Sequence, residues 1–330
     1  MKLKKTLALI MTAAMTIGTM AGCSQSTLNY SKELSNTAKW GAVTSSLEGK
    51  VNVDALGQKE EVTFTATSYS TKEQAYLDMK FNNTSGKVKI PEMKIYVDGM
   101  TTYINKSFYE GLYTMTGQAN PTGLANIKED FIALENPETK GMDINKIKAL
   151  ASQPDVMLQL GKMFFGENSG LDLPFVQNGR EYTLKLDANQ TVDLGAKAIK
   201  AYVNNMENLN NTLGLGLKNE DIAPIKAAVN DAKFDQALPE IKEMLAGSTI
   251  NSKEVFADNS YNADVNVNLQ VKDFGTVSLI VKTTSTKSEV KAITFPTSKI
   301  KLSPEEFVKL TTPATQTTTA IAATKNVVAK

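Results

Sequence analysis

The sequence predicts an α+β protein, with a single curved antiparallel sheet and helices packed over its apolar concave face. Stretches near both ends of the chain alternate apolar and polar residues, which is the pattern of strands with one buried face. The stretch between them carries apolar residues at helical spacing. Because no linker-like composition interrupts residues 39–310, we expect these residues to form one domain with about nine strands.

The first strands are expected to form a meander in the N-terminal third of the chain. Asp98–Gly99 is a strong signal for a two-residue hairpin loop, and Pro91 marks an edge strand or a bulge. The alternation of apolar and polar residues indicates one apolar face and one solvated face. The expected strands are 47–55, 61–67, 74–81, 87–97 and 100–105.

The middle of the chain is predicted to be helical, apart from a hairpin at Asn178–Gly179 that leads into a strand. Pro154 suits the first position of a helix. The stretch 187–193 is similar to a calcium-binding loop, but Val192 replaces the glycine that the sharp turn needs. We therefore interpret this stretch as the cap of a long helix. The expected helices are 144–151, 154–164 and 194–213, followed by shorter ones in 219–247 that break near Pro239 and stop at Gly247.

Strands return in the last quarter of the chain. The clearest one is 261–272, where apolar and polar residues alternate strictly. Ser303 begins a complete helix-start signature, with Pro304 in the first position and Glu306 to close a capping box. Residues 311–330 are rich in threonine and alanine without periodicity, which is typical of a loose tail. The other expected strands are 277–281 and 289–295.

Residues 1–22 have the organisation of a secretory signal peptide, with a lysine-rich start, a short apolar run and small residues at the end. The apolar run is shorter than the roughly 20 residues of a membrane-spanning helix, which argues against an uncleaved anchor. Met20-Ala21-Gly22-Cys23 resembles the lipobox of bacterial lipoproteins, with Met20 in place of the usual leucine. The resemblance implies removal of residues 1–22, lipid on Cys23 and anchoring to the extracytoplasmic face of the cell membrane. Residues 23–38 are then expected to be a polar tether with little structure.

The composition weighs against catalysis and against nucleic acid as a partner. The chain has no histidine, and Cys23 is its only cysteine, so the commonest general base and the thiolate nucleophile are both missing. Basic and acidic residues are nearly balanced, at 36 against 35, so the chain lacks the excess of positive charge that is typical of nucleic-acid-binding proteins. We expect no enzyme, no cofactor and no metal site.

The apolar face of the sheet is the remaining candidate for function. One interpretation is that the sheet and its covering helices enclose a cavity for a lipid or another apolar ligand, with flexible methionines in the lining. The other is that helices fill the concavity and the apolar stripe is core. The candidate lining residues are Phe64, Leu77, Met79, Phe81, Met157, Met163, Phe164 and Leu269.

The order of elements, behind a lipobox, resembles the LolA-like half-barrel superfamily, including lipoproteins of the LppX and LprG type. The resemblance covers residues 39–310 and rests on element order, so no binding residue can be transferred from it. It implies a non-catalytic, membrane-anchored lipoprotein that binds or carries lipid. The alternative is a surface interaction or scaffolding lipoprotein with a filled core, whose polar sheet face meets envelope proteins.

Overall fold

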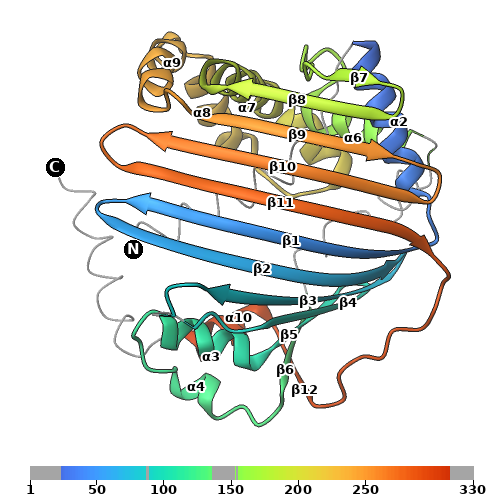
Figure 1. Ribbon diagram of the computed structural model, residues 1–330, viewed down its shortest axis with the longest axis vertical. Helices are drawn as coiled ribbons and strands as arrows, with labels where there is room; N and C mark the ends of the chain where they lie inside the picture. Colours follow the sequence, from blue (N-terminus) through green and yellow to red (C-terminus); the bar gives the residue numbers. More distant parts are fainter. Residues whose placement is uncertain (1–23, 87–88, 136–152, 154, 313–330) are drawn as a thin grey trace. The chain divides into compact units, whose positions relative to one another are not determined.

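The computed structural model describes residues 24–86, 89–135, 153 and 155–312 (Figure 1). In this part of the chain, twelve strands form one mostly antiparallel sheet, which confirms the predicted α+β class and the single sheet. The strands are β1 (Ala42–Ala55), β2 (Gln58–Thr71), β3 (Gln74–Asn83), β4 (Met93–Asp98), β5 (Thr101–Asn105), β6 (Phe131–Glu135), β7 (Val176–Asn178), β8 (Glu181–Asp187), β9 (Thr249–Phe256), β10 (Ser260–Val271), β11 (Gly275–Ser288) and β12 (Lys299–Leu302). Their order in the sheet is β12-β6-β5-β4-β3-β2-β1-β11-β10-β9-β8-β7.

Eight helices lie in the described residues. The helix expected to begin at Pro154 begins at Val156 with Asp155 as its N-cap, and the helix expected to stop at Gly247 ends at Met244. The Asp187 and Ser303 side chains each cap a helix and close a capping box. The break expected near Pro239 is wrong, because Pro239 lies inside a helix that the Asp231 side chain caps. The helices are α2 (Gln25–Ala38), α3 (Lys106–Met115), α4 (Thr122–Ala125), α6 (Val156–Phe165), α7 (Ala188–Leu213), α8 (Asn219–Asn230), α9 (Ala232–Met244) and α10 (Pro304–Thr311). The expected helix 144–151 lies outside the described residues, as does most of the expected tail.

The strand expected at 289–295 is wrong. These residues form an irregular segment, and the strand that follows it, β12, pairs in parallel with β6. The backbone N–H of Lys291 donates to the Tyr69 hydroxyl at 2.7 Å, and that hydroxyl donates to the carbonyl of Glu289 at 3.1 Å. The Tyr69 side chain therefore makes hydrogen bonds with backbone groups of Glu289 and Lys291, which in a strand would pair with a neighbouring strand.

Internal contacts divide the chain into two compact units, where the sequence led us to expect one domain. Unit 1 comprises Met1–Trp40, Lys50–Lys59 and Glu138–Thr286. Unit 2 comprises Gly41–Gly49, Glu60–Pro137 and Lys287–Lys330. Each unit has its own cluster of buried apolar side chains.

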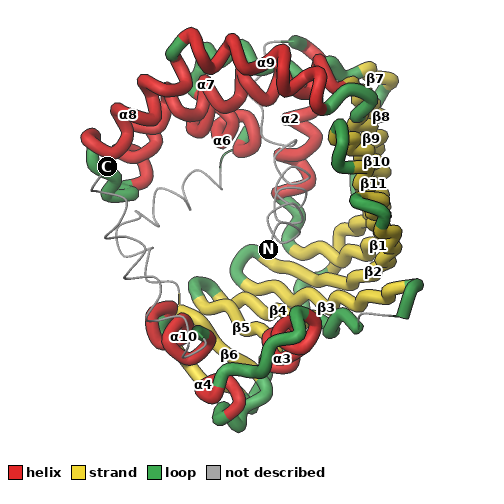
Figure 2. The backbone as a smooth tube through the Cα atoms, turned by 90° about the vertical axis from the view of Figure 1, so that its left-hand side faces the viewer, coloured by secondary structure: helices red, strands yellow, loops and turns green. Residues whose placement is uncertain are grey.

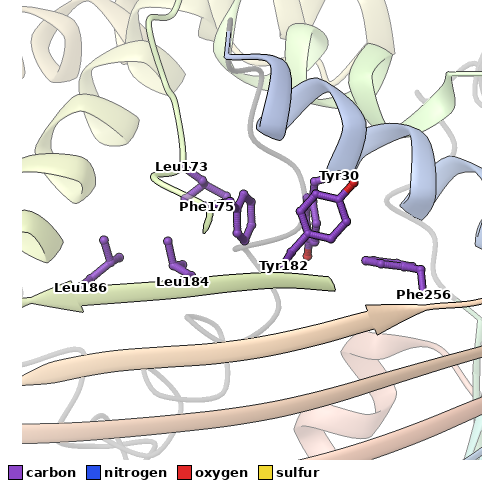
Figure 3. Close-up of a cluster of buried hydrophobic side chains, with 7 residues drawn as sticks. All are labelled: Tyr30, Leu173, Phe175, Tyr182, Leu184, Leu186 and Phe256. Carbon is purple, nitrogen blue, oxygen red and sulfur yellow. The ribbon is translucent and has the colours of Figure 1, made fainter. Parts of the chain in front are cut away.

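In unit 1, α2 packs on β8 and β9 through a dense aromatic core (Figures 2 and 3). Tyr30 of α2 lies with its ring centroid 5.3 Å from that of Tyr182 and 5.7 Å from that of Phe256, both edge-on. Leu184 opposes Ser252 across β8 and β9 and is fully buried. Under α2, the apolar face of the sheet is therefore a filled core. The buried members of this cluster are Tyr30, Leu173, Phe175, Tyr182, Leu184, Leu186 and Phe256.

In unit 2, α3, α4 and α10 cover the apolar face near β5, β6 and β12. The opposite face of this part of the sheet carries a row of tyrosines, placed opposite one another by the strand register. Phe295 from the irregular segment packs on this row, with its ring centroid 6.0 Å from that of Tyr96. The face expected to be solvated therefore holds an aromatic platform. Its tyrosines are Tyr69, Tyr76, Tyr96 and Tyr103.

Gly275 is a position in unit 1 where only glycine fits. Its φ is +133°, and a Cβ there would lie 2.1 Å from the carbonyl oxygen of Asp54 and 2.6 Å from the Cα of Ala55. Both neighbours are backbone atoms, so neither can move aside alone. We expect Gly275→Ala to lower the free energy of unfolding by about 2 kcal/mol more than Gly57→Ala, measured by urea unfolding. Gly57 is the matched control, because its φ is also positive but its Cβ would meet open space; equal losses would contradict the close approach.

Candidate functional site

The chain is structured immediately after the predicted lipidation site. Cys23 itself lies outside the described residues, but Ser24 is the N-cap of α2, and its hydroxyl accepts from the backbone N–H of Thr27. The prediction of an unstructured tether over 23–38 is therefore wrong for Gln25–Ala38. The composition of α2 concealed this helix, because the residues that it buries against unit 1 are mostly small and polar. They are Thr27, Tyr30, Ser31 and Ser35.

Specific polar contacts hold α2 against unit 1. The Ser24 hydroxyl donates to the Asp172 carboxylate at 2.6 Å, and the Thr27 hydroxyl donates to the same oxygen. At the other end, Arg180, the only arginine of the chain, makes a two-pronged ion pair with Glu33 at 2.9 and 2.7 Å. A bidentate pair of this kind fixes both the position and the orientation of the two side chains relative to each other. The helix is thus fixed at its first turn and again in its third.

Four of the predicted lining residues share one face of unit 2. Phe64 of β2 lies opposite Phe81 of β3, with ring centroids 6.3 Å apart, and Met79 and Leu77 follow on the same face. The Phe64 ring lies over Gly49, where any Cβ would be 2.1 Å from it. Met79 is buried, whereas Phe64, Leu77 and Phe81 are only partly buried. This face continues onto β4 through partly buried apolar side chains, which are Met93, Ile95 and Val97.

The other four predicted residues belong to unit 1. Met157, Met163 and Phe164 lie on α6, which packs against α2 and α7, and each of the three is partly buried. Leu269 of β10 is also partly buried and lies opposite Val277 of β11. The predicted residues therefore fall into two sets, one in each unit.

Sequence reasoning missed the buried carboxylate of Glu254. Its side chain is 4 % exposed, and one oxygen accepts hydrogen bonds of 2.7 Å from the hydroxyls of both Tyr30 and Tyr261. Burial raises the pKa of Glu254, and the two tyrosine hydrogen bonds act in the opposite direction. Burial also raises the pKa of Tyr30 and of Tyr261, so both hydroxyls stay protonated as donors at neutral pH.

A second buried polar group lies next to Glu254 on the same face of β9. Ser252 is 3 % exposed, and its hydroxyl has no hydrogen-bond partner within the part of the chain that the structure describes. Among the described residues, Glu254 is the only acidic residue that is buried as a whole. It has no second carboxylate beside it on its strand face, so the acid–base pair that hydrolytic chemistry commonly uses is not assembled there. We interpret the cluster as the polar centre of the α2 contact.

Two open grooves lie on unit 1. One, of about 630 Å³, lies beside the β10–β11 turn, where Lys272 pairs with Glu243 at 2.6 Å. The other, of about 430 Å³, lies between the end of α6 and the middle of α7, and Lys197, Lys200 and Asn205 contribute to it. None of the eight predicted lining residues borders either groove.

No three histidine, cysteine, aspartate or glutamate side chains in the described ranges lie close enough to share a metal ion. No helix in the described part of the chain combines the length and the apolar character needed to cross a bilayer.

The comparisons with known proteins identified no relative of this chain. No protein-family model matches the chain, and no curated protein matches it either. The resemblance to LolA-like lipoproteins therefore stays a prediction from element order.

Proposed function

We propose that this chain is a non-catalytic lipoprotein, anchored to the extracytoplasmic face of the cell membrane through Cys23, that holds a lipid or another apolar ligand on the apolar face of its sheet. The observation that carries the ligand proposal is the apolar face of β2, β3 and β4 in unit 2. Large side chains there, including Phe64, Leu77 and Phe81, remain partly exposed. Side chains of this size normally become fully buried when a partner is present.

The location of the helices in unit 2 supports this assignment. The helices of the unit pack at β5, β6 and β12, around a core that includes Leu124, Ile132 and Leu302. The face over β2 and β3 lies outside that core cluster. An acyl chain laid across it would bury apolar surface, which contributes about 25 cal/mol per Å².

The ligand proposal predicts a loss of bound lipid when this face is made polar. We expect Leu77→Asn with Phe81→Asn to reduce the lipid retained per chain by at least about 100-fold, since the two side chains together contribute about 3–6 kcal/mol when buried and each 1.4 kcal/mol is tenfold. The measurement is native mass spectrometry of protein extracted in mild detergent. Lys80→Asn is the matched control, because Lys80 lies between them on the opposite face of β3 and is exposed. Wild-type protein without co-purified lipid would contradict the proposal.

The alternative function is a surface interaction module without a ligand. Its support is the filled core of unit 1, where Tyr30, Tyr182 and Phe256 pack edge to face under α2. A lipid-free chain that retains a stable envelope protein in a pull-down would favour this alternative.

A further inference from the structure

We propose that one end of unit 1 rests directly on the membrane surface, with no free tether between the lipid anchor and the folded protein. This inference rests on lipidation of Cys23, which is part of the proposed function. The membrane-facing end consists of Ser24, Asp172 and the edge strand β7 (Val176–Asn178). Its partner is the headgroup layer of the bilayer that holds the acyl chains of Cys23.

The length of chain outside the structure leaves no room for a spacer. After removal of residues 1–22, Cys23 alone precedes Ser24, and consecutive Cα atoms are about 3.8 Å apart. A flexible tether over 23–38 would have had an end-to-end distance of about 20–24 Å. Because Ser24 is already hydrogen-bonded to Asp172, the lipidated residue is one peptide bond from the surface of unit 1.

The contacts along α2 show which end of unit 1 this is. Ser24 and Thr27 contact Asp172, just before β7, and Asn29 donates to Gln177 of β7 at 3.1 Å. Further along the helix, Tyr30 contacts side chains of β8 and β9. Since β7 is the last strand in the sheet order, α2 runs from the sheet edge inward. The membrane-facing end is therefore the β7 edge.

The side chains at this edge suit a neutral interface. Val176 is 71 % exposed, an apolar side chain that can enter the headgroup region. The exposed residues beside it include the uncharged Gln177, Asn178 and Pro174, and the charged side chain of this end, Asp172, accepts hydrogen bonds from the Ser24 and Thr27 hydroxyls. The attachment therefore comes from the covalent lipid, and we expect the orientation to be the same on neutral and on anionic vesicles and to be insensitive to salt.

The experiment compares two label positions in the full lipidated protein. Val176→Cys places a thiol at the β7 edge, and Asn36→Cys places one on the last turn of α2, about 18 Å further from Ser24 along the helix. Since Cys23 is the only native cysteine and its sulfur is blocked by lipid, each new thiol can be labelled alone. The readout is energy transfer from a fluorophore on the thiol to acceptor-labelled headgroups in phosphatidylcholine vesicles.

We expect transfer to be clearly higher from position 176 than from position 36. A control chain with 16 Gly/Ser residues inserted between Cys23 and Ser24 should lose most of this difference, because its anchor is flexible. Equal transfer from the two positions in the lipidated chain without the insertion would overturn the inference and leave the anchor standing. An intact mass without acyl chains on Cys23 would overturn both, and it is read independently of the energy transfer.

Discussion

Cys23→Ser is expected to abolish fatty-acid labelling of the chain and to leave residues 1–22 attached. The thioether that a lipobox implies needs the cysteine sulfur, and a serine oxygen cannot replace it. The measurement is metabolic labelling with an alkyne fatty acid in a bacterial host, together with the intact mass of the product. Because Cys23 is the only cysteine, no second thiol can take up the lipid.

The matched control for this experiment is Met20→Leu, which restores the usual first residue of the box. We expect this variant to be labelled at least as well as the wild type. Labelling that persists in Cys23→Ser, or a wild-type chain that carries no label, would contradict the assignment of the anchor.

Glu254→Ala is expected to lower the free energy of unfolding by about 4 kcal/mol. The change removes the acceptor shared by the Tyr30 and Tyr261 hydroxyls and leaves both buried donors unpaired, at about 1–3 kcal/mol each, with a small cavity in addition. Urea unfolding measures the loss. A cost below about 1 kcal/mol would mean that water reaches the two hydroxyls.

Glu254→Gln separates the charge from the hydrogen bonds, because an amide oxygen can accept from the same two tyrosines. The pKa of Glu254 is raised in the folded chain, so the folded state binds a proton that the unfolded state has already released. The free energy of unfolding of the wild type should therefore fall as pH rises above the ordinary carboxyl pKa of about 4.3, towards the raised value. Glu254→Gln should gain stability relative to the wild type over this pH range. A pH-independent difference between the two proteins would argue against a shifted carboxyl group.

Local signals explain why much of the fold could be predicted. The caps at Asp187 and Ser303 depend on a few neighbouring residues, and both were confirmed, as was the capping box predicted at Ser303. The strict alternation over 261–272 predicted β10 to within one residue at each end. In each case the determining contacts lie within the segment itself.

The elements that sequence reasoning missed depend on distant partners. Strand β9 places Ser252 and Glu254 on its inward face, so the apolar alternation that identifies a strand is broken there. Helix α2 buries Thr27, Ser31 and Ser35. The Thr27 hydroxyl donates to Asp172, and the Ser35 hydroxyl donates to the Ser31 carbonyl and accepts from the backbone N–H of Met157. Because polar residues form these core contacts, the polar composition of the segment led to the wrong prediction of a tether.

The candidate site was predicted in part. The register of β2 and β3 confirms that Phe64, Leu77, Met79 and Phe81 share one face, because a period of two leaves no other arrangement. The sequence could not indicate that Tyr30 would fill the face of unit 1 beneath α2. That packing depends on the contact between Tyr30 and Tyr182, which are 152 positions apart in the sequence.

The parallel pairing of β12 with β6 has a consequence for the order in which the chain folds. Asp130 and Ser298, which are joined by a hydrogen bond next to this pair, are 168 residues apart in the sequence. A chain delivered from its N-terminus, in synthesis or in the export that we propose, presents β6 long before β12, so β6 must wait as an uncovered edge strand until β12 follows. Completion of unit 2 is therefore expected to be the slow step of maturation, since contacts of such long sequence separation form late. During that interval, the exposed edge would be the part of the molecule most in need of a chaperone.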